Sequence, residues 1–74
     1  MKFPDDFIHK THPVVSSASQ WTAKKPNGTT ISIVGGGHGL YGNGVTTFEM
    51  WDFDTEQPEG YLSKEEINEY LQKI

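Results

Sequence analysis

The chain has 74 residues, with ten acidic residues against six lysines and a formal charge of −4, and it contains neither arginine nor cysteine. A chain of this length forms one small domain (1–74), and the absence of cysteine excludes disulfides and cysteine-ligated zinc. The acidic balance and the lack of arginine, the residue that most often reads guanine, argue against direct binding to duplex nucleic acid.

The chain has no apolar run long enough for a signal peptide or a membrane-spanning helix. We therefore expect a cytoplasmic protein that does not bind membranes. Hydrophobic residues make up 34% of the chain, so its core is expected to be small.

The N-terminal segment has a proline and two acidic residues at positions 4–6, which suit the first turn of a helix. In such a helix Phe3, Phe7 and Ile8 would share one face. We expect one or two turns that end before Pro13.

Two stretches rich in β-branched and aromatic residues predict strands at about 29–36 and 45–53. A weaker strand is expected at about 17–25, where alternation places Trp21 and Ala23 on one face. The turn signal Lys25-Pro26-Asn27-Gly28 joins this strand to the one at 29–36, because proline presets φ and glycine adopts positive φ without strain. These strands predict an antiparallel meander.

Six of the eight glycines lie in the stretch 35–44. In one interpretation this stretch is a long loop, and long loops often carry function. In the other, which the turn signal favours, Asn43-Gly44 forms a type I′ turn and the stretch is a bulged hairpin. Pairing outward from this turn would place Gly39 opposite Phe48, where a large side chain covers a bare glycine.

The best-marked element is a C-terminal helix at 63–73. Ser63 is the expected N-cap and Glu66 its reciprocal partner in a capping box. Four residues then follow at helical spacing on one face: Ile67, Tyr70, Leu71 and Ile74. The sequence therefore predicts an α+β fold, a small three-stranded antiparallel meander with this helix packed on one face, after a short irregular or helical N-terminal segment.

The third predicted strand carries large apolar side chains on both faces. Trp51 and Phe53 point to one face, while Phe48 and Met50 point to the other. One helix covers only one face of a sheet. Either the N-terminal segment covers the second face, or an apolar surface stays exposed, and such surfaces commonly mark interfaces.

Two motifs suggest ligand binding. The glycine stretch contains G-x-G-x-x-G at 37–42, but a dinucleotide-binding fold needs a helix after this motif, and here a strand is expected. A phosphate cradle made of backbone N–H groups stays open as an alternative. The segment 54–66 resembles the later half of an EF-hand calcium loop, with Gly60 at the sharp turn and Glu66 as the closing glutamate. Its early half departs from the pattern, because Thr55 stands where an aspartate begins the loop.

Catalytic and metal-binding patterns are weak. His9, His12 and His38 could form a three-histidine zinc site, but nothing in the sequence brings His38 to the N-terminal segment. The chain has no cysteine, and no serine stands in a nucleophile-elbow context. We expect no metal, no cofactor and no enzymatic activity.

We predict a small non-enzymatic module that binds a protein partner through an aromatic and glycine-rich β-hairpin surface. The predicted partner-binding residues are His38, Leu40, Tyr41, Asn43, Glu49 and Trp51. One alternative is a small acidic inhibitor or decoy of a nucleic-acid-handling machine, of the type that phages and mobile elements encode. Another is an ion or phosphate-ligand binder, and an exposed sheet face or edge could also form a homodimer.

Overall fold

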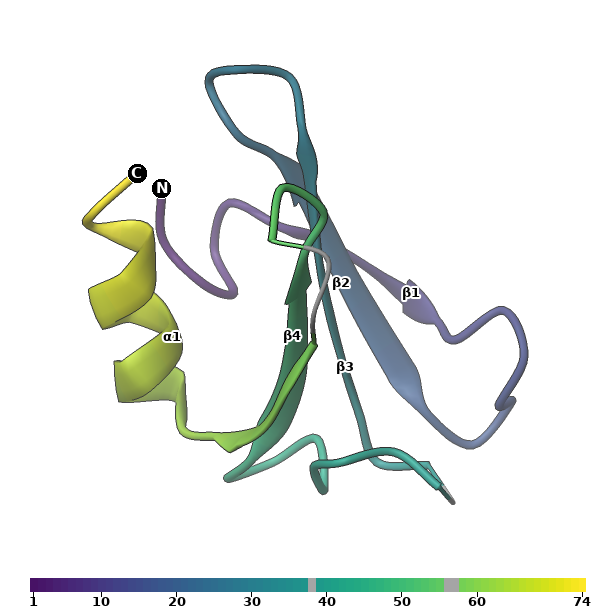
Figure 1. Cartoon of the computed structure of the whole chain (residues 1–74). Helices are drawn as coiled ribbons and strands as arrows, with labels where there is room; N and C mark the ends of the chain where they lie inside the picture. Colours follow the sequence, from purple (N-terminus) through teal and green to yellow (C-terminus); the bar gives the residue numbers. More distant parts are fainter. Residues whose placement is uncertain (38, 56–57) are drawn as a thin grey trace.

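The computed structural model describes residues 1–37, 39–55 and 58–74. It has an α+β fold in which five antiparallel strands follow one another across the sheet and a helix ends the chain (Figure 1). The elements are β1 (Ile8–Thr11), β2 (Ser19–Lys24), β3 (Thr30–Gly35), β4 (Phe48–Asp52), β5 (Glu59–Leu62) and α1 (Lys64–Leu71). The predicted α+β class and antiparallel meander are confirmed. The prediction of three strands is wrong, because one further strand lies at each edge.

The hairpin between β2 and β3 forms as the sequence predicts. The Lys25 N–H donates to the Thr29 carbonyl at 2.8 Å, and Gly28 takes a φ of +90° within the turn. Glycine adopts this angle without the steric cost that a Cβ would add. The register places Trp21 opposite Ile33, so these side chains share one face of the sheet.

The glycine stretch between β3 and β4 is a loop, and the predicted glycine-rich hairpin is wrong. Ser32 pairs with Trp51 across the two strands, so Gly39 lies outside the pairing. The loop backbone packs directly on the backbone of the sheet. A Cβ on Gly42 would lie only 2.6 Å from the Cα of Phe48. The glycines therefore permit close approach of two backbones rather than strand pairing.

Of the one or two helical turns predicted at the N-terminus, a single turn forms. The prediction that the helix continues toward Pro13 is wrong, because strand β1 follows this turn. The Phe7 N–H donates to the Pro4 carbonyl at 3.0 Å, which closes that turn. Extended backbone begins at Ile8, which pairs with Thr22 of β2. Pairing with β2 satisfies the backbone here, where an isolated short helix has little stability of its own.

β5 forms the other edge of the sheet. It pairs with β4 through Leu62 opposite Phe48 and Glu59 opposite Met50, with an irregularity between the two pairs. Tyr61, in the middle of this strand, has a φ of +57°. That angle is uncommon for an aromatic residue and accompanies the irregular pairing.

α1 begins as the sequence predicts. The Ser63 hydroxyl accepts the Glu66 N–H at 3.1 Å, and the Glu66 carboxylate accepts the Ser63 N–H at 2.9 Å. The helix buries Ile67 and Leu71 against the sheet. In the part of the chain that the structure describes, no helix is both long and apolar enough to cross a membrane.

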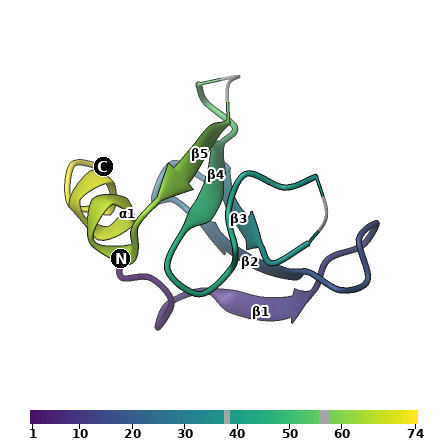
Figure 2. The same cartoon turned by 90° about the horizontal axis from the view of Figure 1, so that it is seen from below.

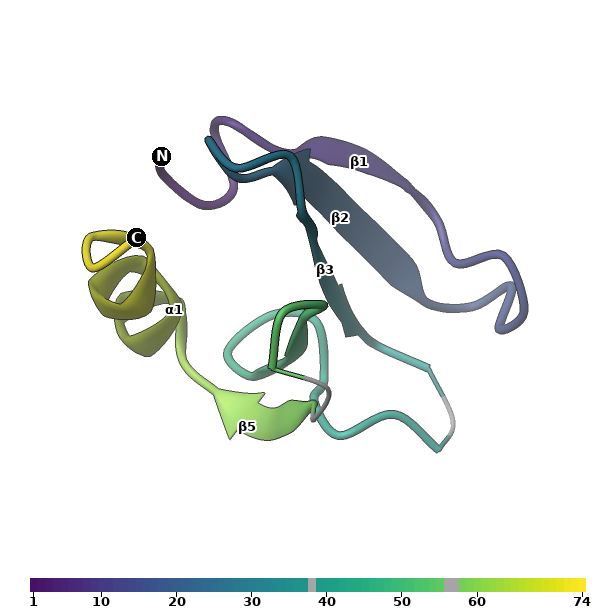
Figure 3. The ribbon, with the colours of Figure 1, turned by 45° about the horizontal axis from the view of Figure 1, so that its top comes forward.

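The N-terminal segment packs on the same side of the sheet as α1, which Figures 2 and 3 show from two directions. The Asn68 side chain joins the two, since it accepts the Phe3 N–H at 2.8 Å and donates to the Phe3 carbonyl at 3.0 Å. The Phe3 ring meets Phe48 edge to face, with ring centroids 5.1 Å apart. The core on this side, which we call the inner face, contains Phe3, Phe7, Ile31, Ile33, Phe48, Met50, Ile67 and Leu71.

The opposite side of the sheet, which we call the outer face, receives no cover from the N-terminal segment. Ile8 and Val14 are 71% and 85% exposed. Of the two arrangements that the sequence allows, the one in which this segment folds over the second face is therefore wrong.

Candidate functional site

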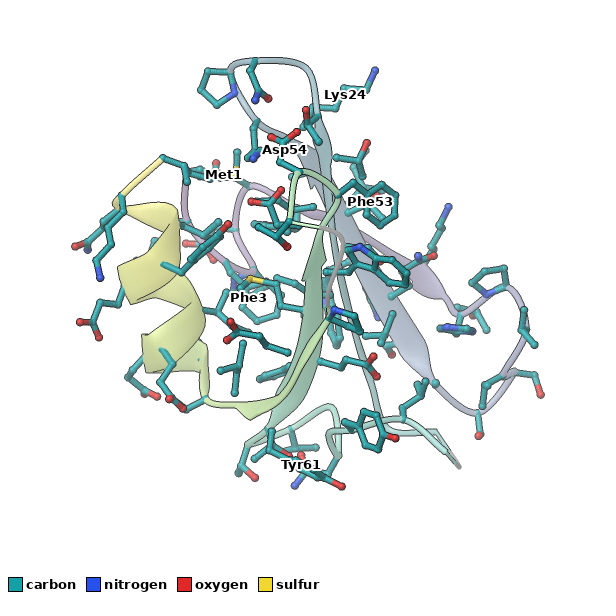
Figure 4. The ribbon with its side chains drawn as sticks, in the orientation of Figure 1. Met1, Phe3, Lys24, Phe53, Asp54 and Tyr61 are labelled. Atoms are coloured by element: carbon teal, nitrogen blue, oxygen red, sulfur yellow. The ribbon has the colours of Figure 1, made fainter. Side chains whose placement is uncertain are left out.

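The outer face presents large apolar side chains to solvent. Trp51 is 42% exposed and Phe53 is 52% exposed. Figure 4 shows Phe3 between α1 and β4, whereas Phe53 lies on the side of β4 away from the helix. Natural antiparallel sheets commonly place polar side chains on their open face. Exposed aromatic residues here therefore mark a candidate interaction surface.

A groove of about 220 Å³ crosses this face, and we call it the outer groove. Strands β2, β3 and β4 provide its floor, and residues before β2 and after β3 border it. Its described lining residues are His12, Gln20, Ser32, Val34, Leu40, Glu49, Trp51 and Phe53. Leu40 lies in the loop between β3 and β4, whereas Glu49 lies on β4. The path of the loop brings these two residues together.

The two aromatic rings of the groove support each other. Trp51 and Phe53 meet edge to face, with ring centroids 5.4 Å apart and planes at 82°. This arrangement is a favourable one for aromatic pairs, because the positive edge of one ring meets the negative face of the other. The pair therefore forms a pre-arranged apolar wall.

Gln20 contributes a polar group that the fold does not satisfy. Its amide nitrogen donates to the Ser32 hydroxyl at 3.1 Å. Its carbonyl oxygen Oε1 is buried and accepts no hydrogen bond from the described residues. Most buried polar atoms in native proteins have a partner, and an unmet acceptor costs about 1–3 kcal/mol. An acceptor without a donor, in a residue that lines the groove, is a feature that a ligand could satisfy.

Three of the predicted partner-binding residues lie together in the outer groove, namely Leu40, Glu49 and Trp51. Tyr41 lies beside them, because its backbone N–H donates to Glu49 Oε1 at 3.2 Å. The Tyr41 side chain is 56% exposed. Another predicted residue, His38, lies outside the described residues.

Asn43 has a local structural role. Its side-chain oxygen accepts the backbone N–H groups of Val45, Thr46 and Thr47 at 2.7–3.2 Å. Asparagine commonly organises a turn in this way. The side chain that we predicted to contact a partner is therefore used inside the loop.

Sequence reasoning missed Gln20 and His12 as members of the site. Gln20 gave no motif, and only the strand register reveals that it faces Val34 across the sheet. His12 Nδ1 accepts the N–H groups of Val14 and Val15, and these bonds hold the ring at the edge of the groove. Tyr61 was also missed; its ring centroid lies 5.8 Å from that of Tyr41.

A separate cluster of charged residues lies where the β2–β3 turn, β4 and α1 meet. Lys25 Nζ lies 2.9 Å from Asp52 Oδ1 and 2.5 Å from Asp54 Oδ2. The Tyr70 hydroxyl donates to Asp52 Oδ2. Asn27 also donates to Asp54, at 2.9 Å. A cavity of about 150 Å³ borders Asp52 and Tyr70.

The pKa shifts of this cluster hold each group in its usual protonation state. Hydrogen bonds to Asp54 and Asp52 raise the pKa of Lys25 above 10.5. Burial raises the pKa of Asp52, but hydrogen bonds from Tyr70 and Lys25 outweigh this effect and lower it overall. Hydrogen bonds from Lys25 and its neighbours lower the pKa of Asp54 to about 2. Burial and the bond to Asp52 raise the pKa of Tyr70 to about 12.

These shifts are typical of a structural ion pair. A general acid or base works best with a pKa near the working pH, whereas all four groups move away from neutrality. An acidic decoy needs carboxylates that are exposed and unpaired, whereas Asp52 and Asp54 both bind Lys25. Asp52 is also only 4% exposed.

The residues of the ligand-binding alternatives have other contacts. Glu66, the closing glutamate of the EF-hand resemblance, bonds to the Ser63 N–H. His9 stacks on Trp21 with ring centroids 4.9 Å apart, and it lies on β1 rather than on a helix shared with His12. Within residues 1–37, 39–55 and 58–74, no three histidine, cysteine or acidic residues form a group that could hold a metal ion.

The chain matches no protein-family model, and neither curated proteins nor solved structures include a significant match to it. The outer groove is therefore the feature of this chain that points most directly to a function.

Proposed function

We propose that the chain is a non-enzymatic protein-binding module that holds its partner on the outer face of the sheet. The observation that carries this proposal is the open face itself: α1 and the N-terminal segment pack on the inner face, while Trp51 and Phe53 stay exposed beside a groove. Aromatic residues at the centre of a surface supply most of the binding free energy in many interfaces.

The shape of the surface supports a protein partner. The outer groove, at about 220 Å³, is smaller than the pockets of about 300–1,000 Å³ that hold drug-sized molecules. It has room for one side chain of a larger partner. Exposed Tyr41 lies next to it, and its contact with exposed Tyr61 extends the aromatic surface toward β5.

The buried charged cluster supports the absence of catalysis in this proposal. Lys25 and Asp52 resemble a catalytic pair in composition, but their pKa shifts favour a permanent ion pair. We assign this pair to the stability of the fold.

The proposal is tested by selecting random 12-residue peptides on phage against the full chain. Selected peptides should bind the parent protein and lose at least about tenfold in affinity for Trp51→Ser, as expected for a hot-spot residue. The matched control is Val45→Ser, since Val45 is 81% exposed but does not line the groove. Peptides that bind the Trp51→Ser variant as well as the parent would contradict the proposal.

A second copy of the chain is the other possible occupant of this face. Light scattering after size-exclusion chromatography measures the oligomeric state of the parent and of Trp51→Ser. We expect both proteins to be monomers at the concentrations used for binding. A dimer that Trp51→Ser dissociates would assign the outer face to self-association and would contradict the proposal of a different partner.

A further inference from the structure

We infer that the outer groove receives a basic side chain, lysine or arginine, from the partner protein. This inference rests on the proposed function and adds the chemistry of the group that enters the groove. Three features of the groove lead to it: its charge, its unsatisfied acceptor and its aromatic wall.

The charge of the groove favours a cation. Glu49 supplies the one carboxylate among its described lining residues, and no lysine is present among them. Glu49 Oε1 accepts the Tyr41 N–H at 3.2 Å, which holds the carboxylate in place. The formal charge of −4 on the whole chain adds a long-range attraction toward basic partners.

The unsatisfied acceptor favours a hydrogen-bond donor. Gln20 Oε1 is buried and has no partner among the described residues, while the amide nitrogen of the same side chain is engaged by Ser32. Lysine offers three N–H donors and arginine five, and neither has an acceptor. A basic guest that pairs with Glu49 can also donate to Gln20 Oε1 once the Gln20 side chain turns this buried atom toward the groove.

The aromatic wall suits the rest of such a side chain. Trp51 and Phe53 are about half-exposed, so part of each aromatic side chain is open to a guest. A cation near the face of tryptophan is attracted by the ring quadrupole. The aliphatic stem of lysine or arginine packs well on apolar surface, which Val34 and Leu40 provide beside the rings.

Other guests leave part of the groove unsatisfied. An acidic side chain would bring a second carboxylate close to Glu49, and like charges in a partly buried site repel each other. A purely aliphatic side chain would cover the Glu49 carboxylate without giving it a partner, and desolvating an unpaired charge is costly. Of these three kinds of guest, a basic side chain is the one that matches the carboxylate, the acceptor and the aromatic rings together.

The test uses the peptides selected against the full chain. Each lysine or arginine in the best binder is replaced in turn by norleucine, which keeps an unbranched apolar stem but removes the charge. We expect one replacement to weaken binding about tenfold. Against Glu49→Gln the same replacement should have an effect of only about twofold, because its charged partner is gone. Glu65→Gln on the exposed side of α1 is the matched control and should behave as the parent.

Binding of the same peptides to the Gln20→Glu variant provides a second, independent test. It places another carboxylate beside the basic guest, so we expect tighter binding of the parent peptide and little change for its norleucine form. Weaker binding of the basic peptide to a folded Gln20→Glu protein would overturn the inference.

The possible failures of the inference and of the proposed function differ in their results. Selected peptides that need Trp51 but carry an apolar or acidic anchor, with no coupling to Glu49, would overturn the basic guest and leave protein binding intact. Peptides whose binding is unaffected by Trp51→Ser would contradict the proposed function and the inference together.

Discussion

The ammonium nitrogen of Lys25 lies 2.9 Å from Asp52 Oδ1, and the two side chains are only 8% and 4% exposed. Tyr70 of α1 donates a hydrogen bond to the same carboxylate, and Asp54 binds the same ammonium group. This network joins the β2–β3 turn, the end of β4 and the helix. It therefore fixes the layers of the domain behind the outer groove.

We expect Lys25→Met to destabilise the fold. The substitution leaves Asp52 buried without its cation, and an unpaired buried charge is strongly unfavourable. The denaturation midpoint in urea should fall well below that of the parent. Lys2→Met is the matched control, because the Lys2–Asp5 pair is 69% and 65% exposed and surface pairs contribute little. Equal midpoints for the two variants would show that the buried pair does not stabilise the fold.

The same network predicts how stability depends on acid. The pKa of Asp54 is about 2 in the folded state, against an ordinary value of 3.8, and the pKa of Asp52 is also lowered. A carboxylate with a lowered folded-state pKa stabilises the fold above its unfolded pKa. This contribution should be lost as the pH falls from about 4 to about 2. Urea unfolding at a series of pH values measures the slope, which should become shallower in Lys25→Met.

At alkaline pH, the fold loses stability through the deprotonation of Lys25 and Tyr70. Their pKa values are raised in the folded state, for Tyr70 from 10.0 to about 12. The unfolded chain therefore releases these protons first, and stability should fall as the pH rises from about 10 to about 12. Tyr70→Phe should make the unfolding free energy fall less steeply with pH in the alkaline range. Part of its dependence on pH in the acid range should remain. An unchanged alkaline slope would mean that Tyr70 does not carry the shift.

Alanine substitutions of two phenylalanines, one on each face of the sheet, test whether the outer face is open to solvent. Phe3 is 1% exposed in the core, whereas Phe53 is 52% exposed on the outer face. Phe3→Ala should cost about 3–5 kcal/mol of unfolding free energy, as in other buried sites. Phe53→Ala should cost less than about 1.5 kcal/mol, mainly through its lost contact with Trp51. Equal costs, measured by urea unfolding, would indicate that the outer face is covered.

The parts of the fold that depend on local chemistry could be predicted from the sequence. The turn at Lys25-Pro26-Asn27-Gly28 and the helix start at Ser63 and Glu66 are encoded by adjacent residues, so their hydrogen bonds form as expected. The alternation that places Trp51 and Phe53 away from the core also follows from the strand period. These local signals were enough for the fold class and for one wall of the groove.

The missed parts depend on contacts between distant segments. All four residues of Ile8–Thr11 are exposed, so this short segment shows no inward-facing pattern and becomes a strand only by pairing with β2. Glu59–Leu62 contains a glycine and pairs irregularly. Asn43-Gly44 gave a strong hairpin signal, but Asn43 instead organises the loop that follows it. The unsatisfied acceptor Gln20 Oε1 could not be predicted, because it depends on how β2 pairs with β3.

Substitutions in the loop test how far the binding surface extends. Leu40 lines the outer groove and Tyr41 lies beside it, 56% exposed. Leu40→Ser and Tyr41→Ala should each weaken peptide binding by about 1–3 kcal/mol and leave the fold intact. Calorimetric titration measures the first effect and urea unfolding the second. Variants that bind as the parent but unfold more easily would place these side chains in the core instead.

The most direct test of the account is a map of the peptide-binding surface by NMR. The full chain, labelled with ¹⁵N, is titrated with a selected peptide while its backbone amide and side-chain signals are followed. We expect the largest shifts at Gln20, Ser32, Glu49, Trp51 and Phe53, including the Gln20 side-chain amide and the Trp51 indole N–H. Signals from α1, such as Glu65 and Glu69, should stay unchanged. Shifts centred on α1 or on the N-terminal segment, with the outer groove unaffected, would contradict the account.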